Sequence, residues 1–112
     1  RDASIEAAWG APDTDAPGGI FGFRALRCGK ILLAVAPDRG RSADRRASYH
    51  DPALPPRHAL RAFGLWLREA EQIHALVHMG AHGTLEWLPG KAVALTARCH
   101  PEGVLGALPV IY

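Results

Sequence analysis

The stretch Ile31-Leu32-Leu33-Ala34-Val35-Ala36 is a continuous apolar run that ends at Pro37. A run of this length predicts a strand buried on both faces, which is typical of a parallel sheet covered by helices. A second apolar segment, residues 75–79, predicts another strand. The helix predicted between them runs over residues 56–71 and begins at a proline, which suits a first helical turn. The sequence therefore predicts a β-α-β unit with parallel strands.

The predicted helix is amphipathic. With a rotation of about 100° per residue, one arc of the helix carries apolar side chains, namely Ala59, Leu60, Phe63, Trp66, Leu67 and Ala70. The charged side chains lie elsewhere, so we expect one face of the helix to pack on a sheet and the other to meet solvent. Leu65 falls outside the apolar arc and marks a candidate surface for another domain of a longer protein.

The remaining elements are predicted to be short. Residues 20–23 and 92–97 predict strands, and residues 104–108 predict a short helix. Residues 1–19 hold closely spaced prolines and glycines, which predict a loop or linker. We therefore expect a single α/β domain over residues 20–112, with a small parallel-type open sheet flanked by helices, as part of a larger protein.

Composition is that of an ordinary folded domain. Of the 112 residues, 48% are hydrophobic and 21% are charged, and the net charge is +2. These values exclude a disordered tail and do not indicate a nucleic-acid partner. No segment approaches the roughly 20 apolar residues that cross a bilayer, so no membrane partner is expected. Cys28 and Cys99 predict two reduced thiols in a cytoplasmic protein, with one long-range disulfide as the alternative.

Residues 78–91 concentrate the chemistry of the chain. The stretch reads HMGAHGTLEWLPGK and holds two imidazoles, one carboxylate and one ammonium. It begins at the carboxyl end of a predicted parallel strand, where open α/β sheets place ligands. His78, His82 and Glu86 recur at intervals of four residues, which suggests a metal site. The pattern is weak, because two glycines and a proline interrupt a continuous helix.

Other interpretations of this stretch stay open. Gly80 and Gly83 could form a tight turn in which His82 makes a hydrogen bond, or their backbone N–H groups could hold an anion. The stretch lacks the spacing of a Walker A motif, so nucleotide binding is not expected. Glu86 beside Trp87 could have a raised pKa and accept a proton near neutral pH, or it could pair with a surface cation.

Residues 38–46 predict a polar loop with four arginines against two aspartates. The forked guanidinium group matches carboxylates and phosphates, so Arg39 and Arg41 are candidates to bind an anionic ligand. The alternative is that the charges of this loop pair with one another. Aromatic residues are not interleaved with the arginines, so RNA binding is not indicated.

Three stretches together resemble the cobaltochelatase large-subunit (CobN) family and, more distantly, the H subunits of magnesium chelatase. They are HMGAHGTLEWLPGKAVAL over residues 78–95, PDRG over 37–40, and residues 49–59, which contain YHDP and PPRHA. The resemblance covers residues 20–112. Thr84 and Trp87 look more like the cobalt branch, whereas Ala81 stands where a lysine is expected, so a role of that side chain is absent here.

The resemblance implies an internal segment of a subunit that inserts Co²⁺, its substrate metal, into hydrogenobyrinic acid a,c-diamide. ATP would be hydrolysed by separate AAA+ subunits of the CobS/CobT type and not bound by this chain. Glu86 and His82 would be catalytic, and His78, His82 and Glu86 would hold the metal, because carboxylates accept protons and neutral imidazoles suit Co²⁺. The candidate residues for binding the tetrapyrrole are Arg39, Arg41, Trp87 and Lys91.

Three functions are compatible with these residues. The chain is the active-site segment of a cobaltochelatase, or it is a structural or interaction domain of the same large subunit or of an H-type magnesium chelatase subunit. The third is a stand-alone metal hydrolase that uses His78 and His82. Replacement of Glu86 and both histidines separates the first two, and a metal that stays bound through purification would mark the third.

Overall fold

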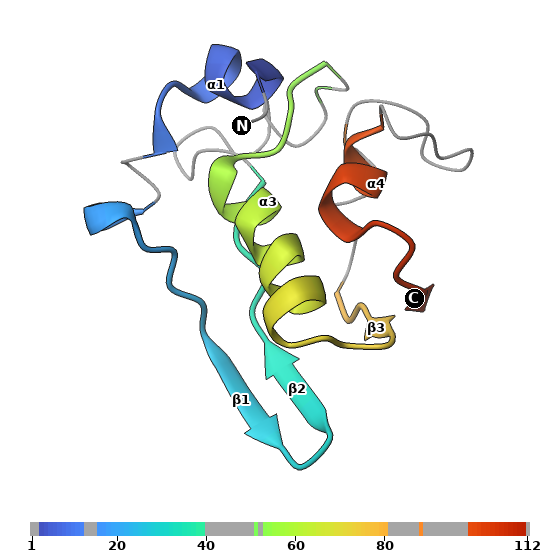
Figure 1. Ribbon diagram of the computed structural model, residues 1–112. Helices are drawn as coiled ribbons and strands as arrows, with labels where there is room; N and C mark the ends of the chain where they lie inside the picture. Colours follow the sequence, from blue (N-terminus) through green and yellow to red (C-terminus); the bar gives the residue numbers. More distant parts are fainter. Residues whose placement is uncertain are drawn as a thin grey trace.

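In this computed structural model the described residues are 3–12, 16–39, 51, 53–80, 88 and 99–111. They form a mixed α/β arrangement, which confirms the predicted class (Figure 1). The elements in chain order are α1 (Ala3–Trp9), η2 (Pro17–Gly19), β1 (Ala25–Cys28), β2 (Ile31–Ala34), α3 (His58–Leu65), η4 (Trp66–Ala70), β3 (Leu76–Val77), α4 (His100–Leu105) and β4 (Val110–Ile111). No helix among the described residues has the length and apolarity that a membrane span requires.

Helix α3 and the π-helical turn η4 follow each other without a break and confirm the predicted helix from His58 to Ala70, but its first turn does not hold the expected proline, because Pro56 precedes the N-cap Arg57. The predicted apolar arc is the packed side of this helix, because Leu60, Phe63 and Leu67 are buried. Leu65, which falls outside the arc, is exposed as expected. The expected partner was wrong, because this helix packs on α4 and not on a sheet, and the charged Arg61 and Arg68 also lie against α4 instead of meeting solvent.

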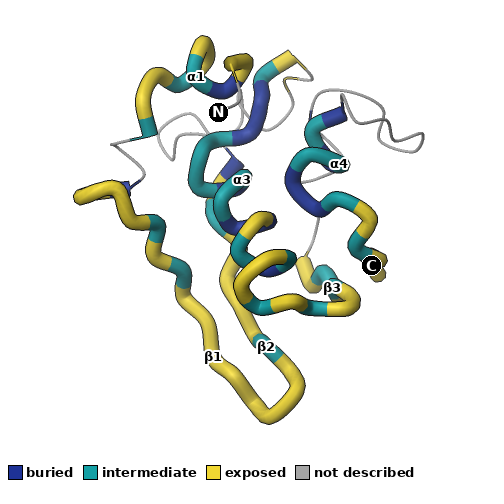
Figure 2. Tube along the Cα trace, viewed as in Figure 1, coloured by how far each residue is buried: buried dark blue, intermediate teal, exposed yellow. Residues whose placement is uncertain are grey.

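Helices α3 and α4 approach each other at Gly64. A Cβ atom at this position would overlap the carbonyl oxygen of Val104, so the approach requires glycine. The core lies around this contact and consists of Leu60, Leu88, Val104 and Leu105, with Leu76 and Leu108 packed against it. The buried segments accordingly gather on α3 and α4 in Figure 2.

Two arginines of the α3–η4 helix fit against glycines of α4 and its cap. A Cβ atom at Gly103 would lie 3.2 Å from Nη1 of Arg61, and one at Gly106 would meet the guanidinium group of Arg68. The missing side chains therefore leave room for the two guanidinium groups. Arg61 Nη1 and Arg68 Nε are buried, and neither has a hydrogen-bond partner in the described part of the chain.

Strands β1 and β2 pair antiparallel as a hairpin that extends away from the helices (Figure 1). The strands are joined by Gly29 and Lys30, and Gly29 has a φ of 60°. A glycine with positive φ at the first of two central residues is what a type II′ hairpin turn requires. Because this turn connects adjacent strands directly, it selects antiparallel pairing.

The hairpin corrects two predictions. Residues 31–36 were expected to be a strand buried on both faces of a parallel sheet, but β2 is antiparallel to β1 and mostly exposed. Residues 20–23 do not form a strand, because pairing begins only at Ala25. The apolar run specifies an extended backbone but not its partner, and the two-residue turn supplies the nearest partner.

Strand β3 pairs in parallel with β4, in the register Leu76–Val110 and Val77–Ile111. The predicted strand over residues 75–79 is confirmed, although it is shorter. Its expected partner was wrong: the parallel neighbour is β4, reached through α4, and not residues 31–36 reached through α3. Of the helix expected over 104–108, only Val104 and Leu105 are helical, because α4 spans His100–Leu105, with Pro101 in its first turn. Residues 92–97 lie outside the described residues.

Residues 1–19 contain helix α1 where a loop was predicted. Ile5 of this helix is buried, and the indole Nε1 of Trp9 donates a hydrogen bond to the carbonyl oxygen of Pro55 at 3.0 Å. The guanidinium group of Arg57 lies over the Trp9 ring at 5.9 Å. These contacts stabilise a short helix that is marginal on its own. The division between a linker and a domain stays a prediction.

Both cysteines are free, which confirms two thiols in place of a long-range disulfide. Cys28 is exposed at the end of β1, and Cys99 is buried immediately before α4. The two thiols therefore differ in access to reagents, and access is one of the factors that control thiol reactivity.

We predict that Gly64→Ala destabilises the chain by about 1–3 kcal/mol, because the new methyl group pushes α4 away from α3. The matched control is Gly103→Ala. There the Cβ atom would lie 3.2 Å from the mobile end of Arg61. This control should change stability by less than about 1 kcal/mol. Urea unfolding followed by circular dichroism measures both, and equal effects of the two substitutions would contradict the close approach at Gly64.

Candidate functional site

The candidate site begins at the carboxyl end of β3. The N–H of His78 donates to the carbonyl oxygen of Ile111 at 2.8 Å, and the N–H of Leu76 donates to that of Pro109 at 2.8 Å. The carboxyl ends of β3 and β4 lie at the same edge of the sheet because the strands are parallel. The placement of residues 78–91 after a parallel strand is thus confirmed, and ligands of α/β proteins bind at such an edge.

Leu88 holds the same stretch at a second point. Its side chain is buried in the core between α3 and α4, together with Leu60 and Leu105. Of this stretch, His78 is thus held at the edge of the sheet and Leu88 in the α3–α4 core. Sequence analysis missed this role of Leu88, since nothing but its apolar side chain marks it in the sequence.

Among the predicted metal ligands, His78 is the one that the structure describes. Its side chain is half-buried, whereas the neighbouring Met79 is exposed. The predicted site residues outside the described part of the chain are Arg41, His82, Glu86, Trp87 and Lys91. The described residues contain no group of three His, Cys, Asp or Glu side chains that could hold a metal ion. The metal set and the catalytic roles stay predictions.

Arg39 is fully buried. Its Nη2 donates to the carbonyl oxygen of Asp51 at 2.6 Å and to that of Leu54 at 3.2 Å. The Asp51 side chain in turn accepts a hydrogen bond from the N–H of Ala53 at 2.8 Å. A buried guanidinium group that bonds to main-chain carbonyls holds this part of the chain in place. The contacts favour such a positioning role for Arg39 over direct contact with a ligand.

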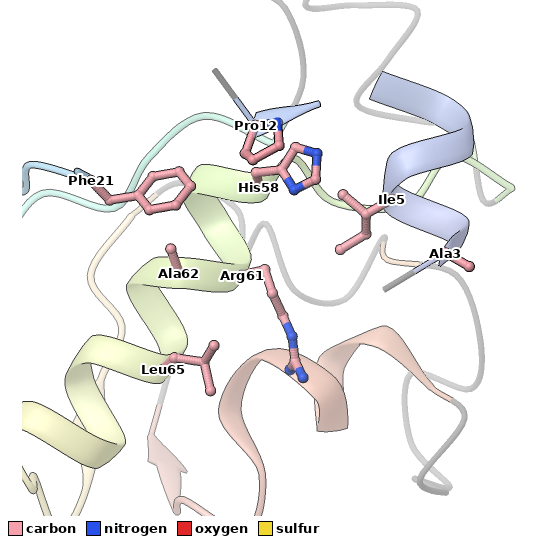
Figure 3. A pocket seen from close by; sticks show the side chains of 8 residues that line it. All are labelled: Ala3, Ile5, Pro12, Phe21, His58, Arg61, Ala62 and Leu65. Atoms are coloured by element: carbon pink, nitrogen blue, oxygen red, sulfur yellow. The ribbon is translucent and has the colours of Figure 1, made fainter. Parts of the chain in front are cut away.

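A pocket of about 560 Å³ opens between α1 and α3 (Figure 3). Its described lining consists of Ala3, Ile5, Pro12, Phe21, His58, Arg61, Ala62 and Leu65. His58 Nε2 lies 2.8 Å from the carbonyl oxygen of Gly10, and the Arg61 side chain extends toward α4. This lining includes none of the residues that the sequence selects for catalysis, so the pocket adds no support to the predicted chemistry.

Comparison with known proteins shows the family to which this chain is similar. The CobN/Magnesium Chelatase family profile matches residues 1–112. The chain is 46% identical over 111 residues to aerobic cobaltochelatase subunit CobN of Pseudomonas aeruginosa, and 44% identical over 110 residues to that of a Sinorhizobium species. It is 38% identical over 112 residues to the H subunit of magnesium chelatase from Chlorobaculum parvum. No solved structure matches the chain.

These alignments cover 96% or 97% of this chain but 9% of each relative. The chain is thus similar to one segment of the large chelatase subunits. The chain belongs to the CobN/magnesium chelatase family. The predicted resemblance is confirmed, and it extends over α1 as well as over residues 20–112.

We predict that Leu88→Ala lowers the free energy of unfolding by about 2–5 kcal/mol, because it leaves a cavity between α3 and α4. The matched control is Ile20→Ala, at an apolar residue just after η2 that is 75% exposed. The control should stay within about 0.5 kcal/mol of the wild type. Urea unfolding compares the two, and a near-zero effect at Leu88 would contradict its role as an anchor.

Proposed function

We propose that this chain is part of the metal- and tetrapyrrole-binding subunit of an ATP-dependent cobaltochelatase. The subunit would insert Co²⁺ into hydrogenobyrinic acid a,c-diamide in cobalamin biosynthesis, while partner AAA+ subunits of the CobS/CobT type hydrolyse ATP. One observation carries the proposal: the stretch HMGAHGTLEWLPGK begins at the carboxyl end of a parallel strand, in a chain 46% and 44% identical to aerobic cobaltochelatase subunits.

The residue types of this stretch suit metal insertion. The metal must lose its water ligands, and the pyrrole N–H groups of the free ring must lose their protons. A carboxylate such as that of Glu86 can accept a proton or pass on the metal. Neutral imidazoles such as those of His78 and His82 are good ligands for Co²⁺.

The two attachment points of this stretch support the proposal. His78 is joined to β4 through its backbone, and Leu88 is buried in the core. Reacting groups must be held within a fraction of an ångström of their working positions, and attachment to rigid elements serves that need. Arg41, Trp87 and Lys91 are the proposed contacts to the tetrapyrrole, while Arg39 acts from inside the fold by holding Asp51 and Leu54.

A scaffold role is the second candidate function. It is favoured by the full burial of Arg39 and by the exposed apolar residues of the β1–β2 hairpin, which suit a piece of a larger assembly. In that case the chemistry lies elsewhere in the large subunit. The similarity to the H subunit of a magnesium chelatase makes Mg²⁺ the alternative substrate metal.

In the assembled chelatase, we predict that Glu86→Gln slows metal insertion by at least about 100-fold, because the amide cannot accept a proton. Binding of the tetrapyrrole and the thermal unfolding temperature should stay unchanged. The matched control is Glu69→Gln, which alters an exposed carboxylate of η4 and should leave insertion intact. Near-normal insertion by Glu86→Gln would move the chemistry out of this stretch and favour the scaffold role.

Titration of the full-length subunit with Co²⁺, followed by visible absorbance, tests the metal ligands. We predict a saturable signal for the wild type and for His74→Ala, because His74 is an exposed histidine outside the proposed site. His82→Ala should lose this signal, since an imidazole is among the preferred ligands of Co²⁺. Saturation that is unchanged in His82→Ala would contradict the proposed metal set, and the same titration with Mg²⁺ compares the two substrate metals.

A further inference from the structure

One face of the β1–β2 hairpin is apolar. Directly paired residues of an antiparallel hairpin share a face, and side chains two apart along a strand do as well. The register pairs Leu26 with Leu33 and Cys28 with Ile31, which places these four side chains together. Val35 lies two residues beyond Leu33 and continues the same face. We call these five residues the apolar hairpin face.

This face is open to solvent. The exposed fraction is 61% for Leu26, 63% for Ile31, 56% for Leu33 and 66% for Val35, and Cys28 is also exposed. Figure 2 shows the hairpin as an exposed arm beyond the buried residues of α3 and α4. Removing such aliphatic side chains from water is favourable, in proportion to the apolar area that is covered. A two-stranded hairpin is marginally stable by itself, so covering this face would stabilise it strongly.

The opposite face of the hairpin is attached to the rest of the chain. Arg27 lies on that face and forms an ion pair with Glu71 at the end of η4. Its cross-strand partner Leu32 is half-buried. Just before β1, the Phe23 ring packs against two aromatic rings of the α3–η4 helix, with centroid distances of 5.2 Å. The hairpin is therefore oriented, with its polar contacts inward and its apolar face outward.

We propose that the apolar hairpin face docks on an aliphatic surface of the same polypeptide, formed by the part of the chelatase subunit outside residues 1–112. The aligned relatives support this occupant, since this chain spans 9% of their length. A stable interface between separate proteins buries about 800 Å² and 20–30 residues on each side. Five residues offer less than that, whereas a covering surface in the same chain avoids the cost of association.

The inference rests on one part of the proposed function, namely that this chain lies within a longer subunit. It does not depend on metal or proton chemistry in residues 78–91. The result for a Glu86 variant therefore neither supports nor weakens it, and failure of the docking is distinguishable from failure of the proposed metal chemistry.

Cys28 provides the probe for the test, because its thiol lies on the apolar hairpin face, while Cys99 is buried. Alkylation by N-ethylmaleimide is followed by mass spectrometry of the peptide that carries Cys28. The rate is compared between the 112-residue chain and the full-length subunit. We expect alkylation of Cys28 to be at least about tenfold slower in the full-length subunit, because the covering surface blocks access.

Two substitutions in the full-length subunit separate docking from other effects. Leu33→Glu places a charge on the apolar hairpin face and should return Cys28 alkylation to within about twofold of the rate in the 112-residue chain. Ala34→Glu places the same charge at an exposed residue on the other face of β2 and should leave Cys28 protected. Circular dichroism of both variants compares their folding.

Either of two results would overturn the proposal. One is equal alkylation of Cys28 in the full-length subunit and in the 112-residue chain, because nothing then covers the face. The other is protection of Cys28 in the 112-residue chain that grows with protein concentration and accompanies a dimer in sedimentation. That result would make the apolar hairpin face an interface between two copies of the chain.

Discussion

The backbone contact between Gly64 of α3 and Val104 of α4 is the constraint on which the rest of the structure depends. Because glycine lets the two helices meet at the backbone, Leu60 and Leu88 can close the core around the contact. The position of α4 then determines where β4 begins, since only a short connection separates the two. Strand β4 in turn provides the carbonyl oxygen that holds the N–H of His78. The packing contact between the two helices thus determines, through α4 and β4, the position of His78 at the start of the candidate site.

The candidate site depends on the same contact from its other side. Leu88 is buried between α3 and α4, and His78 is bonded to β4, so both residues are held by elements that the core positions. Arg39 acts in a similar way at a distance, because its buried guanidinium group holds the carbonyls of Asp51 and Leu54. Arg39, one of the two arginines that the sequence selects as candidates to bind an anionic ligand, thus holds the main chain.

Several apolar side chains on the surface of the chain are not covered by other residues of the described structure. The apolar hairpin face is exposed, as are Met79 and Ile111 at the edge of the parallel sheet. Apolar groups gathered in this way on a small fold mark sites of contact with other parts of a protein. The family comparison is consistent with this, since the chain spans 9% of the length of each relative reported above. The inward side of the hairpin is already held by Arg27 and Glu71, which leaves the outward side for docking.

The sequence by itself determined most of the helix over residues 56–71, the strand before Gly80 and the family. Each of these depends on periodicity, residue type or a motif within a few positions. It also contained signals that were not used: Gly29-Lys30 as a hairpin turn and Pro101 as a helix start. Only the tertiary structure decided that β3 pairs with β4, that Arg39 is buried and that Leu88 belongs to the core. Strand pairing and side-chain burial depend on groups that are distant in the chain. An apolar run or a charged residue does not by itself specify which of these groups it will contact.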